Sequence, residues 1–152
     1  MKPKEKILKL AEIFMYILNL LGGEEYSKTK LIKLLYLLDY ETFKSTGHIF
    51  TDLSYKKYYY GPYSEEIEEA ISLLKDKGIL EVTVTQGIYG QKYYIFKLKR
   101  YEDIERLSKK ERKEIQKKLE NYLNKNLDEI LDIVYETEPV KKARFGERIY
   151  FC

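Results

Sequence analysis

The sequence predicts a mainly α, α+β domain that contains one β-hairpin. Three observations lead to this prediction: two long apolar segments (7–21 and 28–44), two capping-box pairs further along, and alternation of apolar and polar residues across 80–98. The chain has 152 residues and no repeat or proline-rich linker. It is therefore expected to form one compact helical domain over residues 1–152.

The two long apolar segments are predicted to form the centre of the core. Twelve of the fifteen residues from 7 to 21 are apolar, so a helix there must be buried around most of its circumference. Gly22 and Gly23 are expected to end it, because glycine readily adopts the left-handed conformation at a helix C-terminus. Ser27 is predicted to cap a second helix that runs to about Lys44.

The segment 47–63 has a different character. Its glycine, proline, β-branched and aromatic residues favour extended chain over helix. Ser64 is then predicted to cap a third helix that ends at Gly78. Four glutamates fall in the first turns of this helix, where the helix dipole favours negative charge.

The hairpin follows the third helix directly. Residues 80–85 and 94–98 alternate apolar and polar side chains, and 86–90 provide a turn with two glycines. The resulting order from 64 to 98, helix then strand then strand, is that of a winged helix. We therefore predict a winged-helix-like unit in this part of the domain.

The last third of the chain is predicted to contain two helices and a docked tail. Capping boxes open one helix at Ser108 and another at Asn126, and Pro139 is expected to end the latter. The tail ends in the apolar residues Ile149, Tyr150 and Phe151, which are expected to pack onto the domain.

Composition and charge narrow the class of protein. The net charge is only +3, so no overall basic field indicates nucleic-acid binding. Abundant Lys and Glu with few Cys and Met are typical of thermophile proteins. The single cysteine, Cys152, excludes an intrachain disulfide. The segment 7–21 is too short and too polar to span a membrane and carries no cleavage site, so a cytoplasmic protein without a membrane partner is expected.

No arrangement of reactive residues is recognisable. The only histidine, His48, has no neighbour at metal-ligand spacing, and one Cys with one His cannot form a Cys/His metal cluster. Neither G-x-G-x-x-G nor G-x-x-x-x-G-K-[ST] occurs, so no phosphate-binding loop is present. We therefore expect no enzyme, no metal and no cofactor, although an active site built from carboxylates alone has no sequence signature.

The most unusual local feature is a tyrosine-rich segment. Five of the sixteen tyrosines lie in the nine residues 55–63, YKKYYYGPY. Tyrosine gives a large contact area at little cost in side-chain entropy, and its hydroxyl can stay hydrated at the edge of an interface. Both properties are typical of residues in protein–protein interfaces. In an extended chain, Tyr58 and Tyr60 share one face and Tyr59 the other, so one face can pack inwards and the other can contact a partner. The alternative is that both faces belong to the core.

A winged-helix DNA-binding transcriptional regulator is the alternative function. A recognition helix places its N-terminal end against the bases and beside the phosphates, yet the 64–77 helix carries four glutamates at that end. A DNA-binding protein would have to use the basic stretch 100–125, which has nine Lys or Arg and six acids. Solvated helix faces with ion pairs explain that stretch more simply, so nucleic acid is not the favoured partner.

Three short segments together resemble a known family. TKLIKLLYLLD at 29–39 is similar to the Lys-Leu-Leu-Tyr helix of the SocA-like antitoxin family, also called the Panacea domain. KYYYGPYS at 57–64 resembles the family's Tyr-Gly-Pro-Val motif, and PVKKA at 139–143 resembles its closing segment. The similarity covers about residues 25–80, with a weaker match near the end.

The resemblance implies an antitoxin-like protein that binds a toxin-like partner protein and neutralises it, or escorts it as a chaperone or proteolytic adaptor. The residues of this chain that occupy the family's motif positions are Lys33, Leu34, Leu35, Tyr36, Tyr60, Gly61, Pro62 and Tyr63. Tyr63 stands where the family has valine, and tyrosines stand where other members have tryptophan.

The candidate partner surface is the tyrosine segment together with the 64–77 helix. Its predicted contact residues are Tyr58, Tyr59, Tyr60, Gly61, Pro62 and Tyr63. Gly61 and Pro62 are expected to form a rigid turn that sets the entry of the third helix. Lys33 is expected on the exposed side of its helix. A homodimer through the very apolar first helix remains open.

Overall fold

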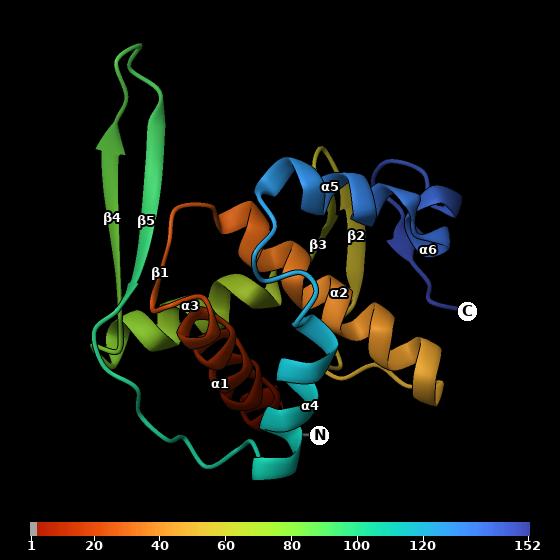
Figure 1. Ribbon diagram of the computed structural model, residues 1–152, viewed down its shortest axis with the longest axis horizontal. Coiled ribbons are helices and arrows are strands. Elements are labelled where there is room, and N and C mark those ends of the chain that lie inside the picture. Colours follow the sequence, from red (N-terminus) through yellow and green to blue (C-terminus); the bar gives the residue numbers. More distant parts are fainter. Residues whose placement is uncertain (1–2) are drawn as a thin grey trace.

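The computed structural model describes residues 3–152 and has the mainly helical α+β fold that the sequence predicts (Figure 1). Within these residues the chain forms six helices and two small antiparallel sheets. The helices are α1 (Pro3–Leu20), α2 (Lys28–Thr46), α3 (Glu66–Asp76), α4 (Lys109–Leu119), α5 (Leu127–Glu136) and α6 (Glu138–Lys142). The strands are β1 (Glu24–Glu25), β2 (Tyr55–Tyr58), β3 (Gly61–Tyr63), β4 (Leu80–Gln86), β5 (Lys92–Leu98) and β6 (Arg148–Ile149).

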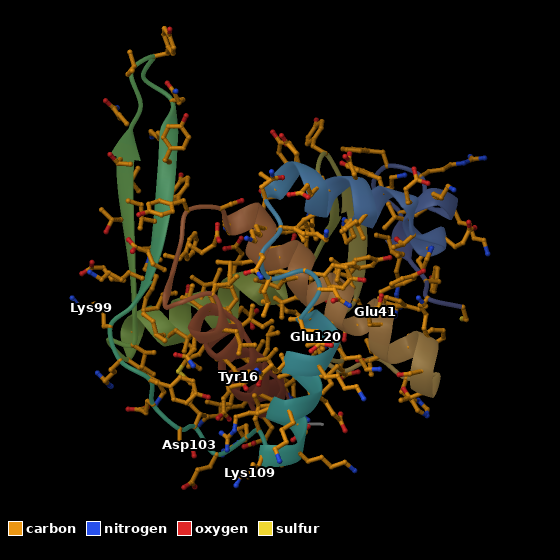
Figure 2. The ribbon with its side chains drawn as sticks, in the orientation of Figure 1. Tyr16, Glu41, Lys99, Asp103, Lys109 and Glu120 are labelled. Carbon is orange, nitrogen blue, oxygen red and sulfur yellow. The ribbon has the colours of Figure 1, made fainter. Side chains whose placement is uncertain are left out.

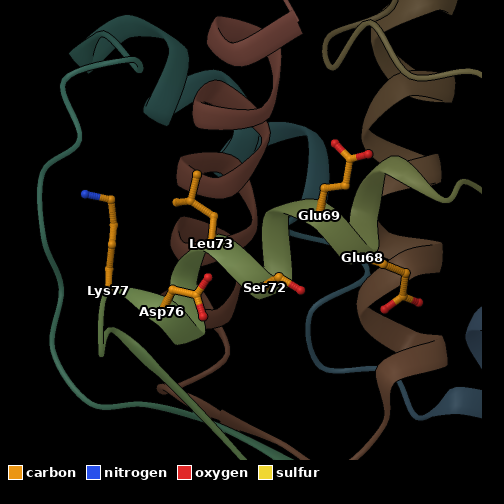
Figure 3. A pocket seen from close by; sticks show the side chains of 6 residues that line it. All are labelled: Glu68, Glu69, Ser72, Leu73, Asp76 and Lys77. Carbon is orange, nitrogen blue, oxygen red and sulfur yellow. The ribbon is translucent and has the colours of Figure 1, made fainter.

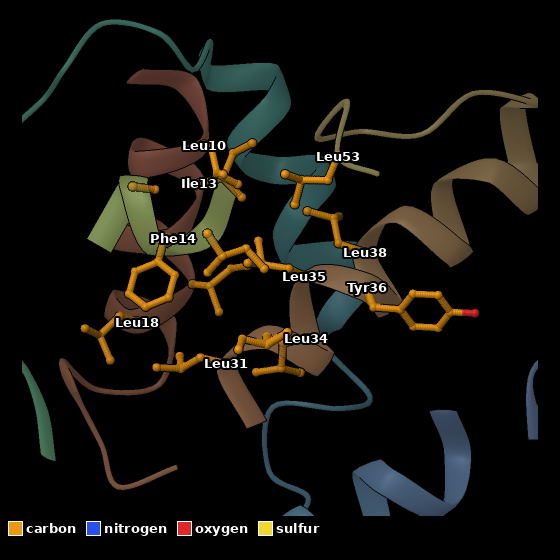
Figure 4. Close-up of a cluster of buried hydrophobic side chains, with 14 of the residues drawn as sticks. Leu10, Ile13, Phe14, Leu18, Leu31, Leu34, Leu35, Tyr36, Leu38 and Leu53 are labelled. Atoms are coloured by element: carbon orange, nitrogen blue, oxygen red, sulfur yellow. The ribbon is translucent and has the colours of Figure 1, made fainter. Parts of the chain in front are cut away.

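The core forms where α1 and α2 pack together, as their apolar composition predicts. Figure 4 shows leucine and phenylalanine side chains of α1 meeting leucine side chains of α2. The buried residues at this contact include Leu10, Ile13, Phe14, Leu18, Leu31, Leu34, Leu35 and Leu38. Residues 31–39 of α2 are buried without interruption, so this helix has no exposed side along that stretch.

Most helix ends follow the predicted local signals. The Ser27 hydroxyl accepts from the backbone N–H of Lys30 at 3.0 Å, and the capping boxes at Ser108 and Asn126 are both complete. Gly22 and Gly23 have positive φ after α1, as expected for a glycine-terminated helix.

Two predicted helix ends are wrong. Helix α3 begins at Glu66, and no side chain caps it; Ser64 is buried and contributes its carbonyl oxygen to the N–H of Ile67 at 3.2 Å. Pro139 does not end α5, because that helix stops at Glu136 and Pro139 lies in the first turn of α6. Proline is well suited to a first turn, where its missing N–H leaves no hydrogen bond unmade.

The predicted hairpin is present and gains a third strand. Strands β4 and β5 pair from Leu80↔Leu98 to Gln86↔Lys92, and β1 adds to the base of β5 to give the order β1-β5-β4. The outer half of the hairpin extends away from the helices as a two-stranded ribbon (Figures 1 and 2). The order α3, β4, β5 is the helix–strand–strand order that the sequence predicts.

A second sheet, which the sequence prediction does not contain, is built from the tyrosine-rich segment and the tail. Strand β2 pairs with β3 on one side and with β6 on the other, where Tyr55 lies opposite Ile149. Beyond β6, the Phe151 ring stacks on Tyr36, with centroids 5.6 Å apart. The tail therefore docks as predicted, and it completes both a sheet and an aromatic cluster.

A buried carboxylate holds the loop between α2 and β2. Asp39 is fully buried, and its Oδ1 accepts the backbone N–H groups of Phe50 at 2.7 Å and Thr51 at 2.8 Å. Its Oδ2 accepts the hydroxyls of Thr51 at 2.5 Å and Tyr55 at 2.8 Å. Burial raises the pKa of Asp39 to about 6, and the hydrogen bonds offset only part of this rise.

We expect Asp39→Ala to lower the free energy of unfolding by about 3–5 kcal/mol, because four donors, three of them buried, lose their acceptor. Asp39→Asn is the matched control: its carbonyl oxygen still accepts both backbone N–H groups, so we expect about half that loss. Urea unfolding monitored by circular dichroism measures both values. Equal, small losses for the two variants would show that the Asp39 cluster does not hold the loop.

Candidate functional site

The tyrosine-rich segment forms a tight hairpin rather than one extended strand. Tyr58 lies opposite Gly61, so Tyr59 and Tyr60 form the turn between β2 and β3. Their side chains are 84% and 63% exposed. The predicted alternation of faces is therefore wrong at Tyr60, because the chain reverses at that point and both turn residues project into solvent. We call residues 55–63 the tyrosine hairpin.

Gly61 is required by the shape of this hairpin. It has a φ of +90°, a conformation that residues with a side chain rarely adopt. A Cβ atom built on it would lie 3.6 Å from a methyl group of Val134 and 3.7 Å from the ring of Tyr135. These are ordinary van der Waals distances, so it is the positive φ of the turn, rather than lack of space beside α5, that requires glycine here.

Pro62 lies in β3, so the predicted turn at the entry of the third helix is wrong. Strand β3 is at the edge of its sheet, where a residue without an N–H does not interrupt pairing. Pro62 faces Lys57 of β2, and its carbonyl oxygen accepts a hydrogen bond from Lys33 Nζ at 2.6 Å. The Gly-Pro pair thus shapes the hairpin and connects it to α2.

Lys33 is buried, contrary to the prediction that it lies on the exposed side of its helix. Its side chain is only 3% exposed, because α2 is covered on all sides around this position. Burial lowers the pKa of the Lys33 amine from 10.5 to about 8. Nothing in the hydrophobic pattern of residues 31–39 distinguishes this lysine from an exposed one.

Tyr36 and the C-terminal motif are also joined to this site. The hydroxyls of Tyr36 and Thr137 share a buried hydrogen bond of 2.8 Å. Lys57 Nζ donates to the carbonyl oxygens of Val140 and Ala143, each at 3.0 Å. The three segments that resemble the family motifs therefore meet, whereas Leu34 and Leu35 face the core and take no part in the surface.

Two aromatic residues that the sequence analysis did not identify complete the exposed surface. The ring of Phe145 lies 4.9 Å from that of Tyr59 and 6.1 Å from that of Tyr58. The Tyr135 hydroxyl donates to the carbonyl oxygen of Tyr59 at 3.0 Å. Both residues are distant from the hairpin in the chain, so only the tertiary structure reveals them. We call Tyr58, Tyr59, Tyr60, Tyr135 and Phe145 the aromatic patch.

A pocket of about 260 Å³ lies between α2, the tyrosine hairpin and α3. Its buried residues are Ile32, Lys33 and Gly61, and its exposed ones are Tyr59 and Tyr60. Lys28, Thr29, Tyr58, Tyr63 and Glu68 also line it. We call this the Lys33 pocket, because it contains the lysine of one family motif together with Tyr60 and Gly61 of another.

Helix α3, the other part of the predicted partner surface, presents an acidic face. A hollow of about 530 Å³ lies along this helix. Figure 3 shows the side chains that line it. Three carboxylates and one ammonium group line it, together with a serine and a leucine: Glu68, Glu69, Asp76, Lys77, Ser72 and Leu73. Glu68 belongs to both the hollow and the Lys33 pocket, so the two depressions adjoin.

The potentially reactive side chains do not gather at this site. Across residues 3–152, His, Cys, Asp and Glu side chains form no group of three or more arranged to hold a metal ion. His48 and Cys152 are both exposed. Over the same residues, no helix combines the length and apolar character needed to cross a membrane.

The structure is therefore that of a small α+β domain whose sequence motifs converge beneath one exposed aromatic hairpin. The chain belongs to the antitoxin SocA-like family: the family model, described as the antitoxin SocA-like Panacea domain, matches residues 31–139. This range runs from α2 into α6 and contains the tyrosine hairpin and every lining residue of the Lys33 pocket except Lys28 and Thr29. No curated protein and no solved structure shows significant similarity to the chain.

The lowered pKa of Lys33 predicts a specific pH dependence of stability. Between about pH 8 and 10.5 the unfolded chain holds a proton at this lysine that the folded chain has lost, so stability rises with pH in this window. We expect the free energy of unfolding of the wild type, relative to Lys33→Met, to increase by about 2 kcal/mol from pH 7 to pH 10. Tyrosine ionisation affects both proteins and cancels in the difference. A pH-independent difference would contradict burial of the amine.

Proposed function

We propose that this protein is a non-catalytic, antitoxin-like module that binds a partner protein in the cytoplasm and neutralises or escorts it. The observation that carries the proposal is the exposed aromatic patch, which lies where the three family motifs meet. Membership of an antitoxin family supports a toxin-like protein as the partner.

The aromatic patch has the properties of a protein-binding surface. Tyr59 and Tyr60 project into solvent, and Phe145 is 58% exposed beside them. Aromatic side chains of this kind supply most of the binding energy in many interfaces. The hydrogen bond from Tyr135 fixes the backbone carbonyl of Tyr59, and the Phe145 ring packs against the Tyr59 ring, so less conformational entropy is lost on binding than for an unsupported loop.

The acidic face of α3 adds charge to the proposed surface. Glu66, Glu68 and Glu69 fill the first turn of this helix. Complementary charge accelerates association and discriminates between partners more than it adds affinity. A partner that covers both the tyrosine hairpin and α3 is therefore expected to carry basic side chains opposite this helix.

A DNA-binding regulator remains the second candidate, because α3 is followed by a projecting β-hairpin (Figure 1). The glutamates of α3 and the tip residues Ile88 and Tyr89 offer nothing that neutralises phosphate. Binding through phosphates would weaken about 10³-fold or more between 50 and 200 mM salt. Sequence-specific duplex binding with such a salt dependence would favour the regulator over the antitoxin-like module.

The test is co-expression with the product of the neighbouring reading frame, because antitoxins are usually encoded beside their toxins. We expect the wild type to restore growth and to bind that protein in calorimetry. The double variant Tyr59→Ala/Tyr60→Ala should bind about 30-fold or more weakly, as expected when two central aromatic contacts are lost. Growth rescue should be lost in parallel.

The matched control is Ile88→Ala/Tyr89→Ala, which removes two equally exposed side chains at the tip of the other hairpin. This variant should keep both affinity and rescue. Equal loss in the two double variants, or none in either, would place the binding surface elsewhere.

A further inference from the structure

Lys33 is a buried cation without a counter-ion among the described residues. Its only hydrogen bond across residues 3–152 is the one to the carbonyl oxygen of Pro62. Two lysines of the same helix differ in this respect, since Lys28 pairs with Glu68 and Lys30 with Glu25. An ammonium group has three N–H donors, so two donors of Lys33 remain for another acceptor. Buried charges in proteins are normally paired, which makes this lysine exceptional.

The Lys33 pocket has the size for one inserted side chain. Its volume of about 260 Å³ is below the range typical of pockets that enclose drug-sized ligands or cofactors. Its buried members, Ile32, Lys33 and Gly61, form the floor, and the exposed Tyr59 and Tyr60 form the rim. A side chain that enters between the tyrosines therefore meets an aliphatic wall and a positive charge.

The charges around the pocket favour an anionic ligand group. Glu68, the one acidic lining residue, already accepts from Lys28 at 2.7 Å and from the Tyr63 hydroxyl at 2.6 Å. Lys28 and Glu68 neutralise each other, which leaves Lys33 as the uncompensated charge. The hydroxyls of Tyr58 and Tyr60 form no hydrogen bond among the described residues and can donate. Each of these free groups can therefore donate, the ammonium can only donate, and a carboxylate is purely an acceptor.

We propose that the Lys33 pocket receives an acidic side chain of the partner protein, whose carboxylate pairs with Lys33 Nζ. This inference rests on the proposed function and names the chemistry by which the site selects its partner. In the free protein the buried ammonium is poorly compensated, and a carboxylate at this position removes that cost. A partner with a neutral side chain there would leave the charge buried and unpaired, so the pocket discriminates against it.

The wild-type protein provides a direct test that needs no variant. The pKa of Lys33 is measured by side-chain NMR of the labelled full chain, with and without N-acetyl-glutamic acid amide as the probe. We expect the probe to raise this pKa by about one unit or more, since an opposite charge in contact favours the ammonium form. N-acetyl-glutamine amide, which has nearly the same shape and no charge, should have no effect. Lys57, bonded to two carbonyl oxygens, is the internal control.

Two results of the titration would overturn the inference. One is an unchanged Lys33 pKa at the highest soluble concentration of the glutamic acid probe, or an equal response to the glutamine probe. The other is a stronger response to inorganic phosphate than to the glutamic acid probe, which would make the pocket a site for small free anions.

Affinity for the partner separates this inference from the proposed function. Lys33→Met, checked for a native-like NMR spectrum, should bind the partner about tenfold or more weakly, and Lys33→Arg should recover part of the loss. Lys92→Met, on the projecting hairpin, is the control and should bind normally. Full affinity of a folded Lys33→Met would overturn the inference and leave the proposed function standing. If the wild type binds no partner, the proposed function fails, and the titration still decides the chemistry of the pocket.

Discussion

The structure depends on how buried helix α2 satisfies its polar side chains. Residues 31–39 are buried without interruption, so each polar group there must find its partner inside the protein. Lys33, Tyr36 and Asp39 follow one another at intervals of three and form a slanted row on the helix surface. Their hydrogen bonds reach β3, the start of α6 and the loop before β2, respectively. These three side chains of α2 thus position the tyrosine hairpin and the segments packed against it.

The sequence predicts those parts of the fold that depend on local signals. The two central helices are evident from their apolar density, and the helix starts at Ser108 and Asn126 follow from capping boxes that involve residues three apart. The second sheet is different, because its strands are two to four residues long and pair Tyr55 with Ile149 across most of the chain. Strands of this length are too short to show a recognisable alternation of apolar and polar residues. The hydrophobic pattern also gives the wrong exposure for Lys33, since a helix buried on every side has no polar face from which exposure can be inferred.

The motif residues mainly hold the segments around the candidate site against one another. Within the three motif segments, Lys33 bonds to Pro62, and Lys57 of the second segment bonds to Val140 and Ala143 of the third. The first of these contacts is buried and the other two are partly buried, and the exposed side chains of the hairpin that they anchor are those of Tyr59 and Tyr60. The resemblance therefore picks out three segments that the structure brings together, a convergence that residue-by-residue reasoning does not predict. It could not identify Phe145, which lies outside every motif segment and joins the aromatic patch only through tertiary packing.

The docked tail has a consequence for biosynthesis. Strand β6 covers one edge of β2, and Phe151 covers Tyr36 and Tyr55, so these groups stay uncovered until residues 148–151 leave the ribosome. Helices α1, α2 and α3 can pack earlier, because every residue they need has already been translated. During that interval the nascent protein carries an open strand edge beside bare aromatic rings, the combination that promotes aggregation. Chaperones that act late on the emerging chain would therefore have more influence on its yield than those that act early.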